Sequence, residues 1–242
     1  MFKNSTINRW IERIKEAYLA DDSVLADSLM KQALVETGSA SRLLEISGII
    51  AYHQGDVQES IRLIEAAMFK IGLSISGQLT LANAWLQTGD FDSTRTTVTF
   101  LVDIIERVPC SMLPDLTHLL SAIQEYELAI AVCREAYERN PDDDNAVFGA
   151  AFYMDRAGHP VELVKSMMLK AVDMKPSSQL YRANLAVVCS AMGQWEIAYS
   201  HACRLSDAAL KSLPCRRMAK QIAELFSRFQ DVDRLEKTVF SD

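Results

Sequence analysis

The chain has 242 residues, of which 49% are hydrophobic and 24% charged, and its formal net charge is −7. This apolar content is sufficient for a continuous core, whereas the negative charge disfavours binding to nucleic acid, which requires clustered Lys and Arg. No stretch approaches the roughly 18 uninterrupted apolar residues of a membrane span, and charges at Arg9, Glu12 and Arg13 leave no apolar signal-peptide core. We therefore expect a cytoplasmic protein that binds neither nucleic acid nor membrane.

A turn-forming residue recurs along the chain at spacings of 34, 35, 34 and 35 residues. The recurring positions are Gly55, Gly89, Gln124, Gly158 and Gly193. Around each of them the same residue types return. A small residue stands seven positions before each turn, and a large or branched apolar residue stands two positions after it. Ser60, Thr94, Ala129 and Ala198 stand five positions after their turns on the same helical face. After Gly158 the corresponding residues, Val161 and Val164, are displaced by one position behind Pro160. A recurrence this regular predicts a repeat of helix pairs, in which small residues let the two helices approach closely.

The helix pairs are expected, in chain order, at residues 5–38, 41–73, 75–108, 112–141, 144–176 and 179–213. The first pair has its turn at Asp21, one period before Gly55. Pro and Gly residues near the ends of the pairs indicate chain reversal there. Capping helices are expected over 215–240, with Ile222, Leu225 and Phe226 on the apolar face of the first and a shorter amphipathic segment around Val232, Leu235 and Val239.

The pattern resembles the tetratricopeptide repeat (TPR) family in the stretches GIIAYHQGDVQESIRLIEAAMFKIG, EYELAIAVCREAYERNPDD and ANLAVVCSAMGQWEIAYSHA. The resemblance covers residues 5–210 or so. It implies an all-α fold, a right-handed α-solenoid of stacked antiparallel helix pairs with C-terminal capping helices, as a single domain over residues 1–242. It also implies a non-enzymatic scaffold or adaptor that binds a partner protein or peptide in the concave groove of the superhelix.

In TPR proteins the first helix of each pair lines the groove, so the resemblance maps partner-binding positions onto this chain. They are Glu45, Ile49 and Tyr52 in the second pair; Leu79, Asn83 and Leu86 in the third; His118 in the fourth; Asn145, Phe148, Phe152 and Asp155 in the fifth; and Asn184 and Val187 in the sixth. Amides can satisfy the backbone of an extended peptide, and rings can cover its apolar groups. For each residue singly, packing between repeats is the alternative role.

One TPR subclass binds acidic chaperone tails through Lys, Asn and Arg on successive first helices. The corresponding positions here hold Ile11, Glu45 and Ile46, so we expect no such binding. Residues 71–145 contain four basic and twelve acidic residues, a balance of −8. Two interpretations stay open: solvated outer faces with acidic helix starts, or attraction of a basic partner segment to the central repeats.

No pattern in the sequence predicts catalysis, a cofactor or a metal site. The four histidines (53, 118, 159 and 201) have no zinc-ligand spacing, and the five cysteines (110, 133, 189, 203 and 215) form no CxxC. We therefore expect no catalytic residues, no cofactor, no metal and no enzymatic activity.

Two alternative functions remain. The first is self-association as a homodimer through the terminal helices, with Phe2, Trp10, Phe229, Leu235 and Phe240 as its apolar surface. The second is an enzyme that uses scattered Cys and His residues.

Overall fold

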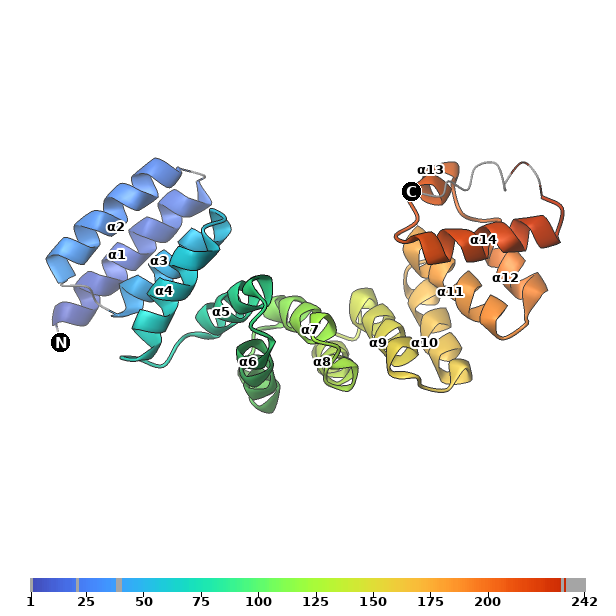
Figure 1. The fold of residues 1–242 in the computed structure, drawn as a ribbon, viewed down its shortest axis with the longest axis horizontal. Coiled ribbons are helices and arrows are strands. Elements are labelled where there is room, and N and C mark those ends of the chain that lie inside the picture. The colour runs from blue at the N-terminus through green and yellow to red at the C-terminus, as the bar shows by residue number, and fades with distance from the viewer. Residues whose placement is uncertain (1, 21, 38–40, 232, 234–242) are drawn as a thin grey trace. The chain divides into compact units, whose positions relative to one another are not determined.

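Helices make up all the regular secondary structure in the described part of the chain, so the expected all-α class is confirmed. The computed structural model describes residues 2–20, 22–37, 41–231 and 233 (Figure 1). The α-helices are α1 (Phe2–Leu19), α2 (Ser23–Thr37), α3 (Ser41–His53), α4 (Val57–Met68), α5 (Ile75–Thr88), α6 (Phe91–Asp103), α7 (Leu113–Ala122), α8 (Tyr126–Arg139), α9 (Asp144–Ala157), α10 (Val161–Met174), α11 (Gln179–Ala191), α12 (Trp195–Ala202), α13 (Asp207–Lys211) and α14 (Arg216–Arg228). Two 3-10 turns, η1 (Ile105–Arg107) and η2 (Cys110–Met112), lie between α6 and α7.

The chain divides into two compact units, residues 1–124 and 125–242. In the first unit α1 packs on α2, α3 on α4 and α5 on α6. Each pair also contacts the first helix of the next one: α1 and α2 contact α3, α3 and α4 contact α5, and α5 and α6 contact α7. In the second unit α9 packs between α8 and α10, and α11 between α10 and α12. Stacked antiparallel helix pairs are therefore confirmed, whereas the single domain over 1–242 stays a prediction.

The recurring turn residue has a left-handed backbone in five of the six predicted repeats, whereas Asp21, the predicted turn of the first pair, lies outside the described residues. The φ angles are 85° at Gly55, 84° at Gly89, 63° at Gln124, 80° at Gly158 and 70° at Gly193. After Gly89, the Asp90 N–H donates to the Trp85 carbonyl five residues back at 2.9 Å, and His159 makes the same bond to Met154 at 3.0 Å. This is the bond that closes a helix whose last residue is left-handed, and it explains why glycine is favoured there.

The small residues around each turn bring the two helices of a pair together. Ser60, Thr94, Ala129 and Ala198, five positions after their turns, and Val164, six positions after Gly158, are all 0% exposed. Of the residues seven positions before the turns, Gly48, Ala82, Ala151 and Ala186 are buried, and Thr117 is half-buried. A Cβ atom added to Gly48 would lie 2.4 Å from Ile64 Cγ1, so this helix contact requires glycine.

The large apolar residue two positions after the turn departs from expectation in one repeat. Val57, Tyr126 and Trp195 are half-buried, as is Val161, which is displaced by one residue behind Pro160, but Phe91 is 51% exposed.

The C-terminal helix α14 caps the core of the second unit. It packs on α11 and α12, and Ile222, Leu225 and Phe226 are buried in a cluster with Leu185 and Leu210. The predicted apolar face of this helix is therefore correct. The shorter amphipathic segment around Val232, Leu235 and Val239 lies outside the described residues.

Candidate functional site

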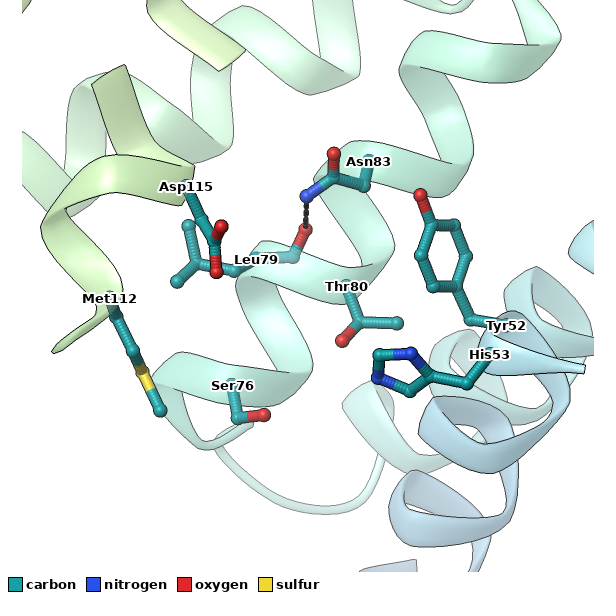
Figure 2. A pocket seen from close by; sticks show the side chains of 8 residues that line it. All are labelled: Tyr52, His53, Ser76, Leu79, Thr80, Asn83, Met112 and Asp115. Carbon is teal, nitrogen blue, oxygen red and sulfur yellow. Dashed lines mark hydrogen bonds between the residues drawn. The ribbon is translucent and has the colours of Figure 1, made fainter. Parts of the chain in front are cut away.

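A cavity of about 290 Å³ lies in the first unit between the first helices of three successive pairs. Figure 2 shows the C-terminal end of α3 on one side of it, and η2 with the start of α7 on the other, with α5 between them. Its lining residues are Tyr52, His53, Ser76, Leu79, Thr80, Asn83, Met112 and Asp115. The cavity therefore lies on the helix faces where the TPR resemblance places a groove.

The start of α5 is held by a buried carboxylate from the preceding pair. Ser74 caps α5, with its Oγ accepting a bond from the Gly77 N–H. Glu45 accepts from the Ser74 backbone N–H at 2.7 Å and from Ser74 Oγ at 2.6 Å, and it also pairs with Arg42. These bonds join α3 to α5 across 29 residues and fix the position of Ser76, which lines the cavity.

Glu45 was one of the mapped groove residues, but it is 1% exposed. Its carboxylate accepts a hydrogen bond from the Ser74 N–H, a backbone donor at the start of α5 that has no partner within the helix. Glu45 therefore positions a helix and is not accessible to a partner, in agreement with the packing role that was its alternative.

Three mapped residues meet at the cavity: Tyr52, Leu79 and Asn83. The Tyr52 hydroxyl accepts a bond from Gln87 Nε2 at 2.7 Å, and Asn83 Nδ2 donates to the Leu79 carbonyl at 3.0 Å. Burial raises the pKa of Tyr52, and the negative charge of Asp115 raises this pKa further. The Tyr52 hydroxyl is therefore neutral at physiological pH.

The other mapped residues of the first unit do not line this cavity. Ile49 and Leu86 are half-buried, and His118 is exposed on α7. Conversely, the mapping missed His53, Ser76, Thr80, Met112 and Asp115. Helical spacing would have indicated some of them: Ser76 and Thr80 precede Asn83 by seven and three residues, and Asp115 precedes His118 by three.

In the second unit the mapped aromatic residues take part in packing. The Phe148 ring stacks on Tyr181 with 4.3 Å between ring centroids and packs against the core. The Tyr181 hydroxyl is 2.6 Å from Asp144 Oδ2 and 2.9 Å from Asn145 Oδ1. Phe148 and Asn145 therefore help to join α9 to α11, which limits their use for a partner.

The remaining mapped residues of the second unit are half-buried or exposed. Phe152 is half-buried with the Arg156 guanidinium 4.8 Å from its ring centroid, and Asp155 is exposed. Asn184 and Val187 on α11 are half-buried, and Asn184 Nδ2 donates to the Leu180 carbonyl at 2.9 Å. Asn184 thus bonds within its own helix, as Asn83 does on α5.

Of the residues considered for self-association, the two whose side chains are described contact other parts of the chain. Trp10 is 3% exposed in the N-terminal core and donates from Nε1 to Glu36 at 3.1 Å. Phe229 stacks on Tyr199 with 4.3 Å between ring centroids. The Phe2 side chain, Leu235 and Phe240 lie outside the described part. Homodimerisation stays a prediction.

The buried thiols have no sign of activation. Burial and, to a lesser extent, the negative charge of Asp143 raise the pKa of Cys133 to about 12. Burial also raises the pKa of Cys189, partly offset by Lys165. Both thiols are therefore protonated at neutral pH, unlike catalytic thiolates. Over the residues that the structure describes, no three His, Cys, Asp or Glu residues gather as a possible metal site, and none of the helices is long and apolar enough to cross a membrane.

Comparison with solved structures finds similar folds at low sequence identity. A tetratricopeptide repeat protein from Parabacteroides merdae matches 96% of this chain and 90% of its own, with a TM-score of 0.65 and 17% identity. PilF of Pseudomonas aeruginosa matches 83% of this chain and 89% of its own, with a TM-score of 0.62 and 13% identity. MamA of MSR-1 matches 78% and 98%, with a TM-score of 0.56 and 19% identity.

No family model and no curated protein matches the chain. Its helix pairs, its left-handed turns at Gly55 and the four equivalent described positions, and its likeness to these structures nevertheless agree with one another. The chain therefore has the fold of the tetratricopeptide-repeat proteins.

Proposed function

We propose that the chain is a protein-interaction scaffold that binds an extended peptide of a partner across α3, α5 and α7. The observation that carries the proposal is the cavity of about 290 Å³ between these helices. The TPR fold supports it as an analogy, since fold alone is a weak basis for function. Tyr52, Leu79 and Asn83, which were mapped as groove residues from the sequence, meet at this cavity.

The lining chemistry suits a peptide. Leu79, Met112 and the Tyr52 ring offer apolar surface, while the hydroxyls of Ser76 and Thr80 offer hydrogen-bond donors and acceptors. Asn83 uses its Nδ2 within α5 and keeps its side-chain oxygen as an acceptor. Apolar surface with a few placed polar groups is typical of a recognition pocket. The enzymatic alternative gains no support from Cys133 or Cys189, whose thiols are protonated.

The test blocks the cavity with one bulky side chain. Ser76→Trp places an indole at the lining, and the matched control, Thr96→Trp, places one on the exposed surface of α6. Peptides are selected on the immobilised wild-type chain from a random phage-displayed library, synthesised with a fluorescent label, and measured by fluorescence anisotropy. We expect Ser76→Trp to weaken binding about tenfold or more, while Thr96→Trp stays within about twofold.

Circular dichroism of both variants checks that they remain folded. Equal binding by wild type and a folded Ser76→Trp variant would contradict the proposal, as would failure to select any peptide.

A further inference from the structure

We propose that the cavity between α3, α5 and α7 receives a lysine or arginine side chain of the bound peptide, and that Asp115 recognises its positive charge. This inference rests on the proposed function and specifies the chemistry of the partner. It is argued from the charges, the polar atoms and the size of the cavity.

Asp115 is the only Asp, Glu, Lys or Arg among the eight lining residues. It is an exposed residue in the first turn of α7, and its side chain is directed towards the cavity in Figure 2. His53 lies on the opposite wall, at the end of α3. Acidic residues in a first turn are favoured by the helix dipole alone, so the position by itself indicates no ligand. The second observation is the cavity, which this carboxylate borders and in which no lining lysine or arginine neutralises it.

The charge of Asp115 extends across the cavity to the opposite wall. It contributes to the raised pKa of Tyr52, a residue of α3, although burial contributes more. A cation placed between α3 and α7 would therefore experience this negative charge.

The neutral lining atoms complement a basic side chain. An ammonium group has three donors and a guanidinium five, and the Tyr52, Ser76 and Thr80 hydroxyls can accept from them. Leu79 and Met112 offer apolar surface for the aliphatic stem, and the Tyr52 ring offers a face for the cation. The volume of about 290 Å³ is at the lower end of ligand pockets, which suits one side chain better than a nucleotide-sized ligand.

The test removes the charge from either side of the contact. Peptides selected on wild type are expected to share a lysine or arginine. One such peptide and its norleucine-substituted form are measured by fluorescence anisotropy against wild type and Asp115→Asn. The matched control is Asp92→Asn, which removes the same charge from a fully exposed side chain on α6. We expect Asp115→Asn to weaken the basic peptide about five- to tenfold, and Asp92→Asn to change binding less than about twofold.

The norleucine peptide removes the positive charge from the ligand and leaves the protein unchanged, so its binding to wild type does not depend on how Asp115→Asn affects folding. It should bind wild type more weakly, and Asp115→Asn should weaken it no further. Selected peptides without a shared basic residue, or equal binding of the basic peptide by Asp115→Asn and wild type, would overturn the inference. If Ser76→Trp still abolishes binding in that case, the groove proposal stands and only the charge recognition fails. If Ser76→Trp binds normally, both fail.

Discussion

Of the five left-handed turn residues in the described repeats, Gln124 alone is not glycine. Gln124 has φ 63°, and a left-handed conformation costs a residue with a Cβ atom about 1–2 kcal/mol. We expect Gln124→Gly to raise the free energy of unfolding by about 0.5–1 kcal/mol, because the added chain entropy of glycine offsets part of the relief. Gly89→Ala should lower it by about 1 kcal/mol, since φ is 84° and no atom lies within 4 Å of the added methyl. Urea unfolding measures both, and a destabilised Gln124→Gly would contradict the account.

Ser60 and Thr94 occupy the same position of successive repeats but differ in hydrogen bonding. Thr94 Oγ1 donates to the Ala82 carbonyl at 3.2 Å, whereas Ser60 Oγ has no hydrogen-bond partner among the described residues. We expect Ser60→Ala to raise the free energy of unfolding by up to about 1 kcal/mol, because a buried hydroxyl without a hydrogen bond is costly. Thr94→Val should lower stability by about 1–2 kcal/mol, because it leaves the Ala82 carbonyl without this donor. Chemical denaturation measures the stability of both variants. A Ser60→Ala variant less stable than Thr94→Val would contradict the hydrogen bonding assigned to these two residues.

His201 on α12 is expected to make stability depend on pH. Burial lowers its pKa, and the positive charges of Arg182, Arg204 and Lys165 lower it further. The unfolded chain, in which the pKa is about 6.5, therefore takes up the proton first as the pH falls. The stability contributed by neutral His201 is fully present above that value and is lost as the pH falls through the folded-state pKa.

The measurement compares urea midpoints of wild type and His201→Gln between about pH 7.5 and pH 5. We expect the midpoint of the variant to fall less over this range. Parallel decreases in the two proteins would show that His201 does not cause the pH dependence.

At the scale of elements, the contact between α3 and α5 depends on the buried carboxylate of Glu45. Glu45→Ala removes the acceptor for the Ser74 N–H and hydroxyl and leaves Arg42 without its partner. We expect a loss of about 2–4 kcal/mol. The control Glu59→Ala breaks an exposed pair with Arg62 on α4 and should cost no more than about 1 kcal/mol. Thermal unfolding measures the stability of the two variants. Similar losses would mean that the hydrogen bonds of Glu45 do not specifically stabilise the contact between α3 and α5.

The helices could be predicted from the sequence because their determinants are local and periodic. The turn at Gly55 and its equivalents needs a left-handed residue, and the buried position of Ala129 and its equivalents needs a small or branched one, so both recur in the sequence. The groove positions were harder. Glu45 and Tyr52 both lie on α3, but Glu45 is buried where it bonds to Ser74, whereas Tyr52 borders the cavity. The difference depends on the position of the loop before α5. Asp115 was missed because it belongs to a helix start, where an acidic residue is ordinary.

At the scale of the whole molecule, the contacts within each of the two units join helices of neighbouring pairs. In the first unit α3 and α4 contact α5, and α5 and α6 contact α7. In the second unit α11 contacts α10, α12 and α14. In such a stack, stability is approximately a sum of the stabilities of the pairs and of the contacts between neighbours. A local defect should therefore weaken its own pair and the adjacent one more than the rest.

Gly48→Ala tests this expectation, because the added methyl would lie 2.4 Å from Ile64 Cγ1 and 3.0 Å from the Ser60 carbonyl oxygen. Gly72→Ala is the matched control, since its methyl has no atom within 4 Å. The overpacked contact should cost about 1–3 kcal/mol, partly offset by the higher helix propensity of alanine. We expect amide hydrogen exchange measured by mass spectrometry to accelerate in α3, α4 and α5 and to stay unchanged in α11, α12 and α14. Equal acceleration in both groups of helices would mean that the chain unfolds as one cooperative body, and no change in α5 would mean that the α3–α5 contact contributes little to the stability of the stack.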